Sequence, residues 1–329
     1  MNRRNLFLIS FLALILSASL SLCLGAANLS LGQVLAAIRC GPRDAAGLIF
    51  WHARLPRTLG CILAGAALSA SGCILQKVLG NSLASPGIIG VNAGAGLAVT
   101  LCCALGALSG WAVAGSAFLG ALAAAGTVIL LSRKTGASRT TVILSGVAMN
   151  SILSGLRDTV TTLVPQVTAL SGEFRVGGFS AVTAQRLLPA GILIAASLLL
   201  ALTLATQLDV LALGEDTARS LGLDLDNLRR LFLILAALLA GAAVSFAGLL
   251  GFVGLLVPHG ARQLAGSESR KLLPLSMVLG AAFVTASDLA ARLLFAPYEL
   301  PVGILMSVIG GPWFLWLLLK RKGGSHAGN

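Results

Sequence analysis

Hydrophobic residues recur along this chain in runs long enough to cross a bilayer. Nine apolar segments are separated by short polar stretches, and a shorter one near 251–265 makes a tenth. The nine lie near 6–25, 58–79, 87–108, 111–131, 140–164, 187–207, 229–250, 273–295 and 302–319. Since a helix needs roughly 20 apolar residues to span the hydrocarbon core, the pattern predicts an all-α integral membrane protein with about ten transmembrane helices.

The composition excludes a water-soluble protein. Hydrophobic residues make up 57% of the 329 and charged residues 10%, against about 25% charged in soluble domains. With a mean hydropathy of +0.95, the chain lacks the polar residues to cover a soluble surface. Its 39 glycines suit helices that cross closely through small residues.

The net charge of +12 reflects topology rather than nucleic-acid binding. If the N-terminus is cytoplasmic, 15 of the 23 basic residues, including all five lysines, fall on the inner side, so both termini are expected in the cytoplasm. The eight others are all arginines: Arg39, Arg43, Arg54, Arg57, Arg157, Arg175, Arg186 and Arg292. Arginine alone on the outer side favours bidentate recognition of carboxylates.

The first hydrophobic run has two interpretations. Arg3 and Arg4 precede an apolar stretch from Leu6 to Leu24, which is longer than the core of a signal peptide, and we therefore expect a retained first span. The small residues at 25–27 keep the alternative of a cleaved signal peptide open.

An internal repeat links the two halves. Residues 63–72 (L-A-G-A-A-L-S-A-S-G) and 239–248 (L-A-G-A-A-V-S-F-A-G) are identical at seven of ten positions. The expected topology runs the first segment inward and the second outward, so the halves would be inverted repeats, as in many transporters. Chance similarity between segments rich in alanine and glycine is the alternative.

Catalytic and metal-binding motifs are missing from the sequence. It contains no H-E-x-x-H, no G-x-S-x-G and no G-x-x-x-x-G-K-[ST] phosphate loop. His52, His259 and His326 are too scattered for a metal site, and the six cysteines form no C-x-x-C pair. The chain therefore carries no nucleotide-hydrolysing motif of its own.

The longest hydrophilic interruption of the hydrophobic chain lies at residues 208–224. Glu215, Asp216 and Thr217 would begin a short amphipathic helix, Gly222 would end it, and a second could begin near Asp224. Two short helices joined by glycine would form a rigid cytoplasmic element on which a soluble partner can push. An ordinary solvated loop is the alternative.

Several motifs follow one another in the order found in permeases that import ferric siderophores, haem and cobalamin. They are R-L-P-R at 54–57, S-G at 71–72 with Gln76, N-S-L-A-S-P-G at 81–87, G-F-V-G-L-L-V-P-H at 251–259 and E-L-P-V-G at 299–303. Ser82 replaces the usual proline, and F-R-V-G-G-F at 174–179 follows the W-x-x-G-[SG]-F pattern only loosely. The chain resembles this family over nearly its whole length, and least in the substrate-facing loop.

The resemblance implies a type II ABC importer permease fold in a single transmembrane domain, residues 1–329. Within it, 1–57 would hold the first helix and an outer segment, 58–165 helices 2–5, 166–208 an outer loop and helix 6, 209–228 the coupling helices, and 229–329 helices 7–10 and a cytoplasmic tail. It also implies a bacterial inner-membrane complex of a permease homodimer, two ATP-binding subunits that hold ATP and Mg, and one extracytoplasmic substrate-binding protein. The chain would be a transport subunit rather than an enzyme and would bind no cofactor or metal directly.

Residue roles follow from the same resemblance. Docking of the binding protein falls to Arg54, Arg57 and Arg292; ATPase coupling to Gly214, Glu215, Ala218, Leu221 and Gly222; the translocation gate to Asn81, Leu83, Ala137 and Ser138; and pathway lining to Met149 and Asn150. Arg292 has two alternative roles, as an interfacial anchor or as the partner of Asp288, four residues earlier on one helix face.

The sequence leaves more than one interpretation for the cargo and for the energy source. Arg157, Arg175 and Arg186 on the outer side suit an anionic chelate, so ferric siderophore is expected ahead of haem or cobalamin. The alternative function is an ion- or proton-coupled secondary transporter, for which Asp158 and Asp288 are the plausible ionisable residues. An intramembrane enzyme would need paired catalytic residues, which the sequence lacks.

Overall fold

The computed structural model describes residues 3–25, 29–134, 139–212, 224–296 and 298–323. Helices make up the regular secondary structure of these residues. Six are long and apolar enough to cross a membrane: α1 (Arg3–Cys23), α4 (Leu55–Val78), α6 (Gly110–Lys134), α9 (Ala184–Thr203), α12 (Leu225–Ala247) and α14 (Ser269–Leu293). α4 is extended at its start by α3 (Ala45–Ile49) and the π-helical turn η1 (Phe50–Arg54).

The other predicted spans also appear as helices. They are α5 (Val91–Ala104), α7 (Arg139–Leu163), α13 (Val253–Ala265) and α15 (Val302–Gly323). Short helices complete the described chain: α2 (Leu31–Cys40), the 3-10 turn η2 (Pro86–Ile89), α8 (Gln166–Val176) and α10 (Ala205–Ala212). The all-α membrane fold and its ten predicted apolar segments are thus confirmed.

Two of the shorter spans begin at strained or glycine-dependent positions. The span predicted over 87–108 is split, because Gly90 at φ 86° separates η2 from α5. α13 starts after Phe252, whose φ of 64° lies in the left-handed region that a bulky residue rarely adopts. The ring of Phe252 packs against Gly310 of α15, because a Cβ added at Gly310 would lie 2.8 Å from Cγ of Phe252. α15 therefore holds the turn at Phe252 in place.

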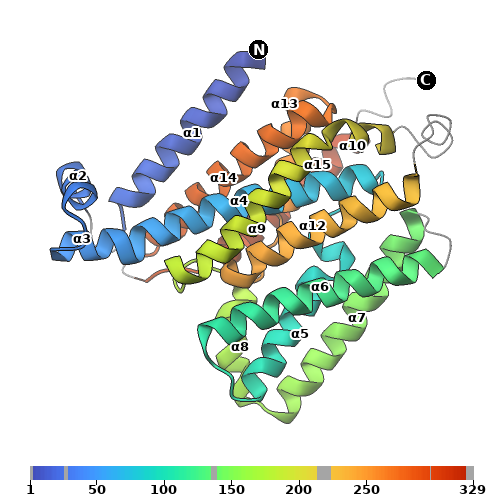
Figure 1. Cartoon of the computed structure of the whole chain (residues 1–329), viewed down its shortest axis with the longest axis horizontal. Helices are drawn as coiled ribbons and strands as arrows, with labels where there is room; N and C mark the ends of the chain where they lie inside the picture. The colour runs from blue at the N-terminus through green and yellow to red at the C-terminus, as the bar shows by residue number, and fades with distance from the viewer. Residues whose placement is uncertain (1–2, 26–28, 135–138, 213–223, 297, 324–329) are drawn as a thin grey trace.

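α4, α12 and α14 are the most enclosed of the six long apolar helices. They run side by side with α9 through the middle of the molecule, α5–α8 cover one side, and α1 lies on the other (Figure 1). α4 and α14 cross closely, since a Cβ at Gly65 would lie 2.2 Å from the carbonyl oxygen of Gly280. Only glycine allows the backbones to approach so far.

The two copies of the repeat lie on adjacent antiparallel helices. Ser71, in the second half of α4, donates to the carbonyl of Ala236 midway along α12 at 2.7 Å, whereas Gly60, near the start of α4, faces Phe246 at the end of α12. The repeat's equivalent glycines contact different helices, Gly65 meeting α14 and Gly241 facing α6. The two copies of the repeat thus run in opposite directions, as inverted halves require.

Candidate functional site

Five charged residues form a cluster where α4 begins and α14 ends. We call Arg54, Arg57, Asp288, Arg292 and Glu299 the arginine cluster. Arg57 donates to both oxygens of Asp288, from Nε to Oδ2 and from Nη2 to Oδ1 at 3.0 Å each, and from Nη1 to Glu299 Oε2 at 2.6 Å. All three nitrogens of this guanidinium therefore have partners within the chain, in the bidentate geometry that favours arginine.

The arginine cluster also forms hydrogen bonds with the C-terminal end of α1. Arg292 Nη2 donates to Ser21 Oγ at 2.7 Å and its Nη1 to the carbonyl of Leu24 at 3.3 Å, while Arg54 Nη1 donates to the same carbonyl at 2.5 Å. Cations at a helix C-terminus complement the helix dipole and satisfy its last carbonyls. The cluster thus joins α1, α4 and α14.

The arginines expected to face a docking partner are mostly enclosed. Arg54 and Arg292 are 7% and 3% exposed, and the side chain of Arg57 is 13% exposed against 37% for Glu299. The contact predicted as the alternative for Arg292 is present, with Nε 3.1 Å from Asp288 Oδ2. Glu299 is therefore the most exposed of these members of the cluster.

Arg57 stabilises the ionised form of Glu299. Partial burial raises the pKa of the Glu299 carboxyl, but the hydrogen bond and charge of Arg57 outweigh it and hold that pKa below its ordinary value. Three arginines against two carboxylates leave the cluster with a formal charge of +1. A carboxylate from outside would satisfy that excess.

A second polar cluster lies at the opposite end of α4. We call Gln76, Lys77, Asp209, Arg262 and Ser269 the Asp209 cluster. Asp209 on α10 accepts from Lys77 Nζ at 2.7 Å, and from the backbone amide and hydroxyl of Ser269 at 2.9 and 2.7 Å. Because Ser269 is the first residue of α14, the carboxylate satisfies a free amide at a helix N-terminus.

The rest of the Asp209 cluster joins α13 to α4. Arg262 Nη2 donates to Gln76 Oε1 at 2.8 Å, and Gln76 Nε2 lies 3.4 Å from the carbonyl oxygens of Gly254 and Leu255. Burial raises the pKa of Asp209, but the hydrogen bonds from Lys77 and Ser269 prevail and lower it below its ordinary value. α10 is thereby fixed to α4 and α14, directly before the predicted coupling segment.

The predicted gate residues Asn81 and Leu83 lie in the turn after α4. Asn81 Oδ1 accepts from the amide of Leu83 at 2.9 Å, which fixes the turn, and Leu83 is 38% exposed. The pathway residues of α7 meet the same connection, since Asn150 Nδ2 donates to the carbonyl of Gly87 at 2.8 Å and Met149 packs near Gly90. The structure thus brings α7 against the 81–90 connection.

Other predicted residues lie outside the described part of the chain or in other contacts. The coupling residues Gly214, Glu215, Ala218, Leu221 and Gly222, and the gate residues Ala137 and Ser138, fall outside the described residues. Both acids considered for a secondary transporter are ion-paired, Asp288 with Arg57 and Asp158 with Arg157 at 2.9 Å. Each of the two acids thus has a basic partner within the described residues.

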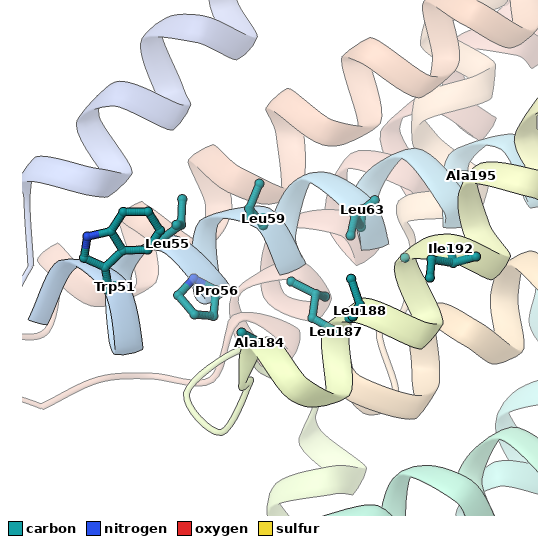
Figure 2. A pocket seen from close by; sticks show the side chains of 11 residues that line it. Trp51, Leu55, Pro56, Leu59, Leu63, Ala184, Leu187, Leu188, Ile192 and Ala195 are labelled. Atoms are coloured by element: carbon teal, nitrogen blue, oxygen red, sulfur yellow. The ribbon is translucent and has the colours of Figure 1, made fainter. Parts of the chain in front are cut away.

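A large apolar groove runs between α4 and α9 at the end that holds the arginine cluster. Its volume is 480 Å³, and in Figure 2 the side chains of Leu59 and Leu63 on α4 face Leu187, Leu188 and Ile192 on α9. Trp51 stands at one end of it, with Nε1 donating to the carbonyl of Ala37 at 2.9 Å. Its lining residues carry no charge, so the groove suits hydrocarbon rather than a polar cargo.

The fold defines a class of protein: a polytopic α-helical membrane protein whose central helix carries a polar cluster at each end. The chain belongs to the FecCD transport family, whose model matches residues 13–320. It is 37% identical to the hemin transport system permease protein HmuU of Yersinia pestis, over 85% of both chains. It is also 37% identical to the vitamin B12 import system permease protein BtuC of Klebsiella pneumoniae, over 98% of this chain and 95% of that one.

A solved structure has the same fold. It is described as an inward-facing conformation of a metal-chelate type ABC transporter, and it superposes with a TM-score of 0.85 at 29% identity, covering 96% of this chain and 99% of the other. The resemblance inferred from the motifs is therefore confirmed over nearly the full length.

Proposed function

We propose that this chain is the transmembrane permease subunit of an ABC importer that carries an iron chelate, with ferric siderophore as the expected cargo. The observation that carries the proposal is the family match over residues 13–320, together with relatives named for haemin transport and for vitamin B12 import. Each of these cargoes, like that of the metal-chelate type transporter, holds a metal within an organic ligand.

The complex proposed for this subunit contains two permeases, two ATP-binding subunits and one binding protein. A separate ATPase is needed because the sequence lacks a phosphate-loop motif. A second permease would cover the exposed face of α7, where Leu144, Ile152 and Leu156 are each more than half exposed. Leucine and isoleucine on this face suit contact with another apolar surface, either a second copy of the chain or the lipid hydrocarbon.

The proposed orientation places the arginine cluster outside and the Asp209 cluster inside. It follows from the location of the lysines in the sequence. In this orientation a carboxylate of the binding protein would approach Arg57 from the side on which Glu299 lies, and α10 would lead into the segment that contacts the ATPase. Charge-assisted docking of this kind increases the association rate and fixes the register.

Reconstitution into proteoliposomes tests the proposal. The chain, its ATP-binding subunit and its binding protein together are expected to import a ferric siderophore when ATP is supplied, and omission of the ATP-binding subunit is expected to abolish uptake. An uncoupler should leave uptake unchanged while ATP remains. Uptake by the chain alone, or uptake driven by an imposed ion gradient, would contradict an ABC importer.

A further inference from the structure

A smaller groove lies on another face of α9, between α6, α9 and α12, and has a volume of 210 Å³. Phe118 of α6, Leu193 of α9 and Ala242 of α12 make its walls apolar. Trp111 lies at one end, close to the start of α6, and is 55% exposed. The groove therefore opens to the surroundings of the bundle at the end of α6 that holds this tryptophan.

Arg186 also lines this groove and is the charged residue of its lining. Its guanidinium lies against the backbone of α6, since a Cβ at Gly110 would be 2.6 Å from Cζ. Nε donates to Thr183 Oγ1 at 3.2 Å, and within the described residues no carboxylate forms an ion pair with Arg186. Nη1 and Nη2 are thus left to bind an anion from outside the chain.

The position of this arginine selects the kind of anion. α6 and α9 are two of the apolar spans, and both begin at this groove, so Arg186 and Trp111 lie where a membrane-spanning helix leaves the hydrocarbon. Tryptophan and arginine concentrate at that depth, the ring among the headgroups and the guanidinium on phosphate. An apolar groove that ends in an unpaired arginine complements a phosphate ester with a hydrocarbon chain.

We propose that this groove binds one glycerophospholipid, with its phosphate on Arg186 and an acyl chain along Phe118, Leu193 and Ala242. The larger groove in Figure 2 provides the contrast, because it lies on a different face of the same helix and is lined by uncharged residues. That groove would accept any hydrocarbon chain, whereas the groove at Arg186 would prefer a lipid whose headgroup carries a phosphate. A bound lipid would stabilise α9, which leads directly into α10, the helix that carries Asp209.

Native mass spectrometry of the delipidated full-length chain in mild detergent tests the proposal, with phosphatidylglycerol added stepwise. Wild-type protein is expected to retain one tightly bound phosphatidylglycerol. Arg186→Gln should weaken this binding about tenfold, the effect of losing one charge-assisted hydrogen-bonded contact. A diacylglycerol with the same chains should bind about tenfold more weakly than phosphatidylglycerol and should not respond to Arg186→Gln.

Three further variants test the two parts of the site. Gly115→Leu should abolish retention by filling the groove, and it should fold because a Cβ at Gly115 meets nothing within 4 Å. Arg175→Gln, on α8 and away from the groove, and Ala184→Leu, in the groove of Figure 2, should leave retention unchanged. Thermal denaturation of each variant checks that it is folded.

Three outcomes would overturn the assignment. Equal binding of phosphatidylglycerol to wild type and to folded Arg186→Gln would show that the arginine does not recognise phosphate. Equal binding of diacylglycerol to the wild type would reduce the groove to a hydrocarbon contact. Displacement of the lipid by glycerol 3-phosphate alone would indicate a site for a free phosphate ester.

Discussion

The arginine cluster provides a quantitative test of the structure through the substitution Asp288→Asn. Asp288 is 1% exposed and lies within hydrogen-bonding distance of two arginines that are themselves largely enclosed. Its loss leaves buried positive charge uncompensated, and removing one partner of a buried ion pair costs roughly 3–5 kcal/mol. Glu299→Gln is the matched control, because Glu299 is partly exposed and such a pair contributes ~0.2–1 kcal/mol.

The assay is unfolding of the full-length chain in mixed micelles with increasing sodium dodecyl sulfate, followed by circular dichroism. Asp288→Asn should unfold at a distinctly lower detergent fraction than wild type, and Glu299→Gln close to wild type. The triple variant Arg57→Met, Asp288→Leu, Arg292→Met should recover most of the lost stability, because apolar residues of similar volume often replace a buried ionic triad without loss.

Two results would refute this reasoning. If Asp288→Asn and Glu299→Gln unfold alike, the carboxylate of Asp288 is not the buried counter-ion that its contacts indicate. If the triple variant is as unstable as Asp288→Asn, the loss comes from packing among α1, α4 and α14 rather than from uncompensated charge.

Three further predictions concern docking, acid stability and packing. Glu299→Gln should tighten binding of the binding protein, because it removes the negative charge that competes with an incoming carboxylate for Arg57; weaker or unchanged binding in a surface-immobilised assay would contradict this competition. Folding lowers the pKa of Asp209, so the stability that this carboxylate contributes is complete above its ordinary pKa of about 4 and is lost as the pH falls through its lower folded pKa. Asp209→Asn should therefore remove this part of the acid sensitivity in unfolding titrations. Gly72→Ala should destabilise the chain by roughly 1–3 kcal/mol, because its Cβ would lie 1.8 Å from a carbonyl oxygen of α13; Gly115→Ala, at an open position, should unfold like wild type.

The spans were predictable because they depend on composition over a length, which a sequence displays directly. Their ends were not, because local backbone geometry sets them. The span expected from 229 begins at Leu225, where Asp224 caps the helix by accepting from the amide of Asn227 at 3.1 Å. α13 begins after Phe252, whose unusual φ depends on packing against α15, and no neighbouring residue in the sequence signals that contact.

The polar clusters show the same limit for the candidate site. The pair of Asp288 and Arg292 could be foreseen from its i, i+4 spacing. Lys77 and Asp209 are 132 residues apart, and Arg57 and Glu299 are 242 apart, so their pairing depends on helix packing that spacing does not encode. A lysine within an apolar span was the available signal that an acidic partner exists.

The contacts of α4 also indicate how motion could pass between the two ends of the molecule. Its first and last turns are held to the ends of antiparallel α14 by the arginine cluster and the Asp209 cluster, roughly 30 Å apart along α4. Between the clusters the two helices touch backbone to backbone at Gly65 and Gly280, which leaves little freedom to bend or slide. We therefore expect α4 and α14 to move as one rigid unit, so that a displacement of α10 at the end that holds the Asp209 cluster reaches the arginine cluster through this pair. The 81–90 connection, which is attached to α7 through the side chain of Asn150, would adjust to that displacement and change the face that α7 presents.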